Sequence, residues 1–422
     1  MTGSPVAVRW PTVPAGRPHY ESLFLRAVDP VTGAAVWLRH TMQRTPGRGR
    51  GATTTPRGLR DTTTAAHRPG DATRDPDRGA LWCTLWSADG RPHATKRSAG
   101  SLRAPAHDGT GSAWISVGDD PGDPGVASPA HDAGDASRGS SVVRVGITGG
   151  TPPSGASAGP PAAAGERGMD GSSLGPDGTV GAISMSDERP GARWDLTFAG
   201  GGEPLAHLPF PGLYGSPLPR TKPTSPRPEW RISGTVAVGG VTVTLDDAPG
   251  VLGHNWGSEH AHRWLWLHGT GFDAAPDTWI DVAMARVRVG SGRASLTLPW
   301  AAVGALSLHG RRIPLGLSAR RRPGRVRHWS PGRTVVELPA ADGHVEVEHH
   351  TPPEQMVAWI YADAAGGEDH HALNGSRTAV RVTWVPRRGA PVTVEAPFGG
   401  VLEQGIPADE PHPVPVLPFA DG

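Results

Sequence analysis

Residues 253–269 read GHNWGSEHAHRWLWLHG and bring together histidines, tryptophans, an asparagine and a glutamate. Imidazole exchanges protons near neutral pH, and burial can raise the pKa of a glutamate toward the same range. The side chains of this stretch that could carry a proton to or from a ligand are His254, Glu259, His260 and His268. We therefore take these four as the candidate general acids or bases of a catalytic site.

The second half of the stretch, HRWLWLH, alternates as a β-strand does. Side chains two residues apart in a strand share a face and lie about 6.6 Å apart. Leu265 and Leu267 then face a core, and the opposite face is a row of rings made by His262, Trp264, Trp266 and His268. Such a face is typical of a cavity wall that binds an apolar ligand.

A carboxylate further along the chain is expected to join this wall. Asp281, in the segment WIDVAMARV, shares a face with Trp279 and is expected to orient a histidine. The residues expected to bind the ligand are Asn255, Trp256, His262, Trp264, Trp266 and Asp281.

Two other interpretations of the stretch stay open. His260 and His262 have the spacing of a zinc-binding pair on a strand, but the remaining ligands would have to come from elsewhere. Alternatively, the tryptophans are core residues and each histidine is hydrogen-bonded within that core. Because buried imidazoles and carboxylates need partners, we favour a cavity wall with a catalytic cluster, and we expect no metal.

Composition narrows the class of protein. Lys and Arg number 41 against 40 Asp and Glu, so the formal net charge of +1 gives no overall case for nucleic acid as a partner. Cys83 is the single cysteine, which suits a reducing compartment. The sequence shows neither a signal peptide nor a long apolar run, so we expect a cytoplasmic protein without stable membrane insertion. The expected partner is a hydrophobic small molecule.

An arginine-rich segment at 311–328, RRIPLGLSARRRPGRVRH, contains no acidic residue. One interpretation is a patch that binds an anionic partner. No aromatic residue interrupts the run, so it offers no platform on which a base could stack. We favour a solvated connection between strands.

The segments that must position these residues alternate with a period of two, and none has a long helical period, so the sequence predicts an all-β fold of antiparallel strands. Strands are expected at 20–28, 34–41, 80–86, 192–198, 229–238, 241–247, 262–269, 277–289, 294–300, 333–340, 343–351, 356–363 and 378–385. Two stretches rich in Gly, Pro, Thr and Ser, about 45–79 and 118–178, are predicted to be disordered loop insertions, with a short strand near 141–148.

The stretch GHNWGSEHAHRWLWLHG resembles the signature of tocopherol cyclase and the carotenoid 1,2-hydratase (hydroxyneurosporene synthase) group. Further segments fall in the order seen in that family, among them YESLFLRAVDPVTGAAVWLRHT at 20–41, PFPGLYGSPLPRTKPTSPRPEWRISGTVAVGG at 209–240 and MVAWIYADAAG at 356–366. The chain has His254-Asn255 where the carotenoid hydratases resemble an acidic Asp-His-Glu-Trp pattern, so their proton donor does not carry over.

The resemblance implies two tandem lipocalin-like β-barrel or sandwich domains. They are expected at 18–247 and 248–400, followed by a Pro-rich tail at 401–422. It also implies an isoprenoid- or polyketide-like ligand and cofactor-free acid/base chemistry such as hydration, cyclisation or isomerisation. The alternative is a non-catalytic carrier of a lipophilic metabolite, which needs the same cavity and no poised acid.

Overall fold

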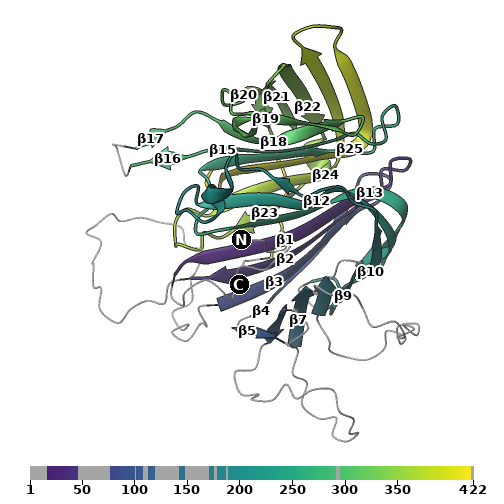
Figure 1. Cartoon of the computed structure of the whole chain (residues 1–422). Helices are drawn as coiled ribbons and strands as arrows, with labels where there is room; N and C mark the ends of the chain where they lie inside the picture. The colour runs from purple at the N-terminus through teal and green to yellow at the C-terminus, as the bar shows by residue number, and fades with distance from the viewer. Residues whose placement is uncertain are drawn as a thin grey trace, which may run out of the picture.

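The fold was analysed in a computed structural model of the chain. The structure describes residues 17–45, 77–99, 101–107, 113–118, 142–147, 171–174, 178–186, 189–290 and 295–419. These residues form two large antiparallel sheets in tandem, the lipocalin-like all-β arrangement that the sequence predicts. Figure 1 shows the sheet made by the first half of the chain below the sheet made by the second half. The predicted insertions lie largely outside the described residues.

The first sheet has 13 strands, in the order β4-β3-β2-β1-β13-β12-β10-β9-β8-β7-β6-β5, with β11 paired to β12. All neighbours are antiparallel except β7 and β8. Its strands are β1 His19–Val28, β2 Ala35–Arg44, β3 Asp77–Trp86, β4 Pro92–Ala99, β5 Ser101–His107, β6 Ala113–Gly118, β7 Val142–Ile147, β8 Gly171–Leu174, β9 Gly178–Ile183, β10 Ala192–Ala199, β11 Leu205–Ala206, β12 Thr221–Val238 and β13 Val241–Gly257.

The second sheet has 10 strands, in the order β19-β18-β15-β14-β25-β24-β22-β21-β20, with β23 paired to β24. Its strands are β14 Arg263–Gly269, β15 Trp279–Arg286, β18 Ala301–Leu308, β19 Arg311–Gly316, β20 Arg325–Ser330, β21 Arg333–Ala340, β22 Gly343–His350, β23 Val357–Tyr361, β24 His370–Pro386 and β25 Val392–Pro407. A small ribbon pairs β16 Arg288–Val289 with β17 Leu296–Thr297, and short 3₁₀ turns lie at η2 Pro211–Tyr214, η4 Leu317–Ala319 and η5 Pro353–Gln355.

Alternation along each strand gives each sheet a filled core and a second, outward face. On β1 and β2 the residues that turn into the first core include Leu23, Leu25 and Leu38. On β14 the core residues of the second sheet are Leu265 and Leu267, as their spacing predicts. Apolar side chains therefore fill both sheet interiors, and the residues between them in sequence are left to face the other sheet.

The faces that meet between the sheets are rich in aromatic rings. β2 and β3 contribute Trp37, Trp82 and Trp86, and β23 contributes Trp359 and Tyr361. Trp82 meets Trp359 edge to face with ring centroids 4.8 Å apart. Offset and edge-to-face contacts of this kind add to the area that the rings bury.

Beside the rings, Arg26 of β1 is fully buried and reaches across to the second sheet. Its Nε donates to the carbonyl of Ser376 at 2.9 Å, and its Nη1 donates to that of Gly399 at 3.1 Å. Its Nη2 donates to the carbonyls of Ser376, Phe398 and Gly400. Burial lowers the pKa of Arg26 to about 9, so the guanidinium keeps its charge at neutral pH.

Several expected elements differ from those in the structure. β13 continues to Gly257 and pairs with β1 and β12, so the first sheet extends beyond the expected boundary at residue 247. β25 runs to Pro407, into the segment expected to be a tail, and has no counterpart among the predicted strands. The strand expected at 294–300 is limited to β17. The two-residue hydrophobic period that predicts a strand is interrupted in these segments, because bulges and glycines change which face successive side chains occupy.

The arginine-rich segment forms β19 and β20, at opposite ends of the strand order of the second sheet, with η4 between them. Arg312 donates to the carbonyls of Glu203 and Pro204, and Arg327 pairs with Glu337. The expected connection is therefore partly strand. Within the described part of the chain, no helix is long and apolar enough to cross a membrane.

Replacing Arg26 with methionine is expected to lower the free energy of unfolding by about 3–5 kcal/mol, because four carbonyls would lose a buried donor. Urea unfolding of the variant and the wild type measures the change. Arg193→Met is the matched control, since Arg193 is exposed on β10. An equal effect of the two substitutions would contradict the role assigned to Arg26.

Buried histidines make the folded state sensitive to acid. Burial lowers the pKa values of His40, His268 and His349 from 6.5 to about 4. Between these values the unfolded chain binds more protons than the folded one, so stability is full above 6.5 and is lost as the pH falls toward 4. Each histidine is expected to contribute at most about 1.4 kcal/mol per pH unit.

The pH dependence can be tested at one strand position and its neighbour. His349→Gln is expected to flatten the loss of unfolding free energy between pH 6.5 and 4. His350→Gln, on the exposed face of the same strand, is expected to leave the slope unchanged. Denaturant unfolding at a series of pH values gives both slopes, and the interpretation fails if the two variants behave alike.

Candidate functional site

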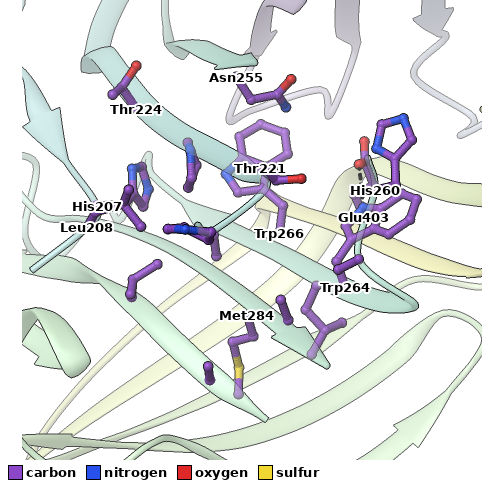
Figure 2. A pocket seen from close by; sticks show the side chains of 18 of the residues that line it. His207, Leu208, Thr221, Thr224, Asn255, His260, Trp264, Trp266, Met284 and Glu403 are labelled. Atoms are coloured by element: carbon purple, nitrogen blue, oxygen red, sulfur yellow. Dashed lines mark hydrogen bonds between the residues drawn. The ribbon is translucent and has the colours of Figure 1, made fainter. Parts of the chain in front are cut away.

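A cavity of about 340 Å³ lies between the facing surfaces of the two sheets. This volume is in the range of small-molecule sites. Figure 2 shows Trp264, His260 and Glu403 at one end, His207 and Leu208 at the other, and Trp266 between them. Its wall comes from β1, β2, β12 and β13 on one side, from β14, β15 and β18 on the other, and from the segment 207–219.

The indoles of β14 have room because their neighbours across the sheet are small. Trp264 pairs with Ala285 of β15, and Trp266 pairs with Ala283. On the other side of Trp264 stands Gly405, where a Cβ atom would lie 2.0 Å from Cδ2 of the indole. Small residues on both sides thus let the two rings lie in the wall of an apolar cavity.

The first polar group at the cavity is His254 of β13, paired with Glu21 of β1. The Nε2 atom of His254 lies 2.8 Å from Oε1 of Glu21, and both side chains are buried. β1 and β13 are paired neighbours, and Glu21 lies two residues from Leu23, the partner of His254 in the register, so the two side chains are on the same face of the sheet. The other ring nitrogen, Nδ1, has no hydrogen-bond partner among the described residues.

The second polar group joins the two sheets through Asp281 of β15. His207 Nε2 lies 3.1 Å from Oδ1 of Asp281, and Trp266 Nε1 donates to the same oxygen at 3.0 Å. Ser225 of β12 donates to Oδ2 at 2.5 Å. Burial alone would raise the pKa of Asp281, but the charge and hydrogen bonds of His207 outweigh it, so the pKa is lowered and the carboxylate is ionised at neutral pH.

His207 resembles His254 in one respect: its Nδ1 atom has no hydrogen-bond partner in the described part of the chain. Both imidazoles line the cavity. A carboxylate on one ring nitrogen fixes the tautomer and stabilises the charge that the ring takes up with a proton. The cavity therefore has two histidine–carboxylate pairs, each of which leaves one nitrogen for proton exchange.

His260 lies in the turn between the two sheets and is packed among rings. It stacks on Tyr20 with centroids 4.4 Å apart and on Trp264 at 5.5 Å. Burial, together with His370 and Arg39, lowers the pKa of His260 to about 3. A neutral imidazole at neutral pH can accept a hydrogen bond or a proton, but it is not an acid there.

Glu403 of β25 closes the same end of the cavity. Its Oε1 accepts from Trp264 Nε1 at 2.9 Å, and its Oε2 accepts from Asn374 Nδ2 at 3.3 Å. The hydroxyl of Tyr361 lies 3.5 Å from Oε2. The carboxylate thus fixes the plane of the Trp264 indole that forms the wall.

Of the residues proposed from sequence, the structure brings His254, Asn255, His260, Trp264 and Trp266 to the cavity wall. It also places Asp281 against His207, a histidine that the sequence did not single out.

Four other proposed residues lie elsewhere. Glu259 is partly exposed and pairs with Arg220. His262 lies 3.5 Å from Glu368, outside the cavity lining. His268 is buried, and its Nε2 donates to the carbonyl of Pro228, which explains why it does not face the ligand space. Trp256 is buried away from the lining, against Tyr214.

Sequence reasoning missed Glu21, Arg39, His207 and Glu403. Glu21 and Arg39 did carry a signal, because each is a charged residue inside a strand that is otherwise largely buried. His207 lies in a segment rich in proline and leucine, with no periodicity to place it. Glu403 belongs to β25, a strand that was not predicted.

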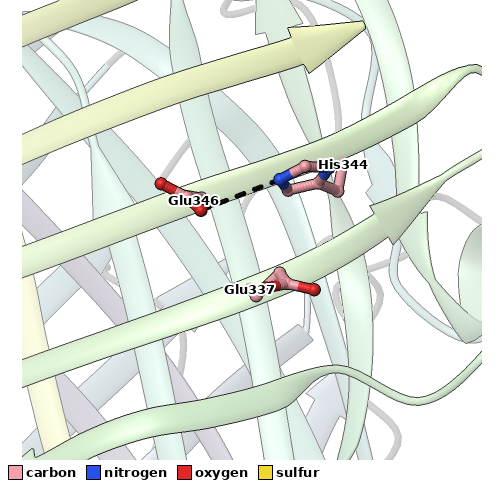
Figure 3. A group of neighbouring side chains, drawn as sticks. All are labelled: Glu337, His344 and Glu346. Carbon is pink, nitrogen blue, oxygen red and sulfur yellow. Dashed lines mark ion pairs between the residues drawn. The ribbon is translucent and has the colours of Figure 1, made fainter. Parts of the chain in front are cut away.

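A separate group of potential ligands lies on the second sheet, on β21 and β22 (Figure 3). His344 Nε2 lies 3.7 Å from Oε1 of Glu346, and Glu337 stands beside them. Glu337 is also paired with Arg327. Because that cation already balances one carboxylate, the group is a surface ion cluster and we assign it no metal.

Comparison with known proteins rests on structure, since no family model and no curated protein matches the chain. CghA is similar with 11% identity and a TM-score of 0.51, over 100% of this chain and 93% of that chain. The structure of CghA with Sch210972 is 12% identical with a TM-score of 0.49, over 94% of this chain and 90% of that chain. Kievitone hydratase from Nectria haematococca is 8% identical with a TM-score of 0.39, over 96% of this chain and 94% of that chain. The likeness to CghA shows that this chain shares its tandem lipocalin-like fold.

Proposed function

We propose that the protein is an enzyme that binds a hydrophobic, isoprenoid- or polyketide-like molecule between its two sheets and catalyses acid/base chemistry on it with side chains alone. One observation carries the proposal: an apolar cavity is flanked by two histidine–carboxylate pairs, His254–Glu21 and His207–Asp281. A cavity that only stored a lipophilic molecule would not need buried imidazoles and carboxylates, which are expensive to desolvate.

The two pairs suit a reaction in which one proton is added and another is removed. One imidazolium donates its proton to a carbon–carbon double bond or a carbonyl oxygen of the ligand, and its carboxylate partner stabilises it beforehand. The other imidazole accepts a proton from water or from a carbon next to the developing cation. Removal of a proton from water gives hydration. Removal of a proton from carbon gives isomerisation or, after ring closure, cyclisation. In each route one proton is added and one is removed, and exchange with water then returns a proton to the first imidazole and takes one from the second.

The walls suit the charge that would develop in such a reaction. Trp264 and Trp266 present indoles to the cavity, and aromatic faces attract cations. Trp266 is held by its donation to Asp281, and Trp264 by its donation to Glu403. The rings are therefore fixed before the ligand arrives, which favours the charged transition state over the neutral substrate.

Replacing either histidine of the pairs with glutamine is expected to lower turnover by about 100-fold or more, the usual contribution of a general acid or base. The assay incubates the protein in D₂O with an organic extract of the cells that make it, and mass spectrometry follows deuterium gained at carbon. His254→Gln and His207→Gln should each abolish the label above background. His262→Gln, outside the cavity lining, is the control and should retain it.

The same assay separates an enzyme from a carrier. A molecule that binds and is recovered without deuterium or any change in mass would contradict the proposal and favour a carrier of a lipophilic metabolite. Normal labelling by the double variant His207→Gln/His254→Gln would also contradict it, because the chemistry would then lie elsewhere.

A further inference from the structure

Arg39 is a buried cation in the cavity wall. It lies on β2 with a side chain that is 5% exposed, on the face that turns toward the second sheet, and it is among the cavity-lining residues. On the same face, two residues earlier, stands Trp37. The neighbouring core-facing positions of this strand, Leu38 and His40, point into the first sheet instead.

The guanidinium is held rigidly at one edge. Its Nε donates to Oγ of Ser22 at 2.7 Å. Its carbon lies 4.0 Å from the ring centre of Tyr361 and 5.3 Å from that of Trp82. These contacts fix the plane of the group but leave Nη1, which has no hydrogen-bond partner among the described residues although it is buried.

No carboxylate neutralises Arg39 in the described part of the chain. Glu403, an acidic side chain of the cavity wall, bonds to Trp264 and Asn374, and no ion pair joins it to Arg39 in the described part of the chain. Lys96 lies over the ring of Trp82, 3.9 Å from its centre, and burial together with Arg39 lowers the pKa of that lysine. Two cationic side chains, Arg39 and Lys96, thus lie against the ring of Trp82.

Trp37 adds a second unused donor. Its Nε1 is buried, and no hydrogen-bond partner for it exists among the residues that the structure describes. The ring is held by stacking on Trp359, with centroids 5.9 Å apart. Buried donors normally have a hydrogen-bond partner. Here two such donors lie on one face of a strand at a cavity, where an oxygen atom of a ligand can accept from them.

We propose that the guanidinium of Arg39, with Nε1 of Trp37 beside it in the wall, binds an anionic oxygen group of the ligand, so that the substrate is a hydrophobic molecule with a carboxylate or an ionised enol. The inference rests on the proposed function, because it assigns one end of the molecule that the cavity holds. The anion offsets a buried positive charge for which the described residues supply no carboxylate, and it orients the apolar body toward Trp264 and Trp266.

A pair of fluorescent probes with one skeleton tests the inference. 1-Anilinonaphthalene-8-sulfonate and N-phenyl-1-naphthylamine differ only by the sulfonate. We expect the wild type to bind the sulfonate more tightly. Arg39→Met should weaken sulfonate binding by roughly tenfold to a hundredfold and change binding of the uncharged amine by less than about twofold. Fluorescence titration of the full chain measures both affinities.

Controls separate charge in the cavity from charge in general. Arg231→Met removes a half-exposed cation of β12 that pairs with Asp247 and should leave both affinities unchanged. Arg39→Lys should keep part of the preference. Ser22→Ala, which frees Nε of Arg39 without removing its charge, should weaken sulfonate binding less than Arg39→Met, and it serves as the second variant if Arg39→Met does not fold.

The outcomes distinguish this inference from the proposed function. If the uncharged amine binds and the sulfonate has no advantage that Arg39→Met removes, the anionic subsite is wrong while the apolar cavity stands. Equal loss of both probes in a folded Arg39→Met protein also overturns the subsite. If neither probe binds the wild type, both the inference and the proposed function lose their cavity.

Discussion

The fold depends on how the two sheets are held against each other, and the strongest single contact in that interface is the burial of Arg26 in a cage of carbonyl oxygens. No counter-ion for this charge lies among the described residues, and its burial is tolerable because the guanidinium donates to four carbonyl oxygens of the second sheet. The acceptors lie within β24 and β25, beside the bulge at Thr378, where Gly399 and Gly400 carry no side chain that would cover the backbone. The guanidinium therefore binds backbone atoms of the second sheet, and its hydrogen bonds depend on the path of that backbone and not on side chains.

The position of the sheets then fixes the chemistry of the space between them. His207 comes from the first half of the chain and its partner Asp281 from the second, so this pair exists only when the sheets are docked. The same holds for Trp266, which belongs to the second sheet and packs edge to face on Phe24 of the first. Interface packing and site geometry are consequently one arrangement, and an error in docking would separate acid, carboxylate and indole together.

Sequence patterns predicted the all-β class, most strands and the ring-bearing face of β14, since a two-residue period is a local property. They did not predict the contacts of Glu21 or His207, because each depends on a strand or loop far away in sequence. A row of four side chains on one face was expected to act together, yet only Trp264 and Trp266 reach the cavity. The two histidines of the row lie at the ends of this strand, where they contact other groups. His262 lies beside Glu368, and His268 donates to the carbonyl of Pro228.

The cavity is walled mainly by the outward faces of strands whose inward faces fill two separate cores. On β15, Ala283 and Ala285 lie on the cavity wall, Val282 packs in the core of the second sheet, and Met284 packs in that core and also lines the cavity. A larger side chain at Ala283 or Ala285 would press on the indole of Trp266 or Trp264 beside it, so these two positions set both the ligand space and the place of the rings. The width of the cavity is therefore fixed at the same positions that hold its aromatic wall in place, so neither can be altered alone.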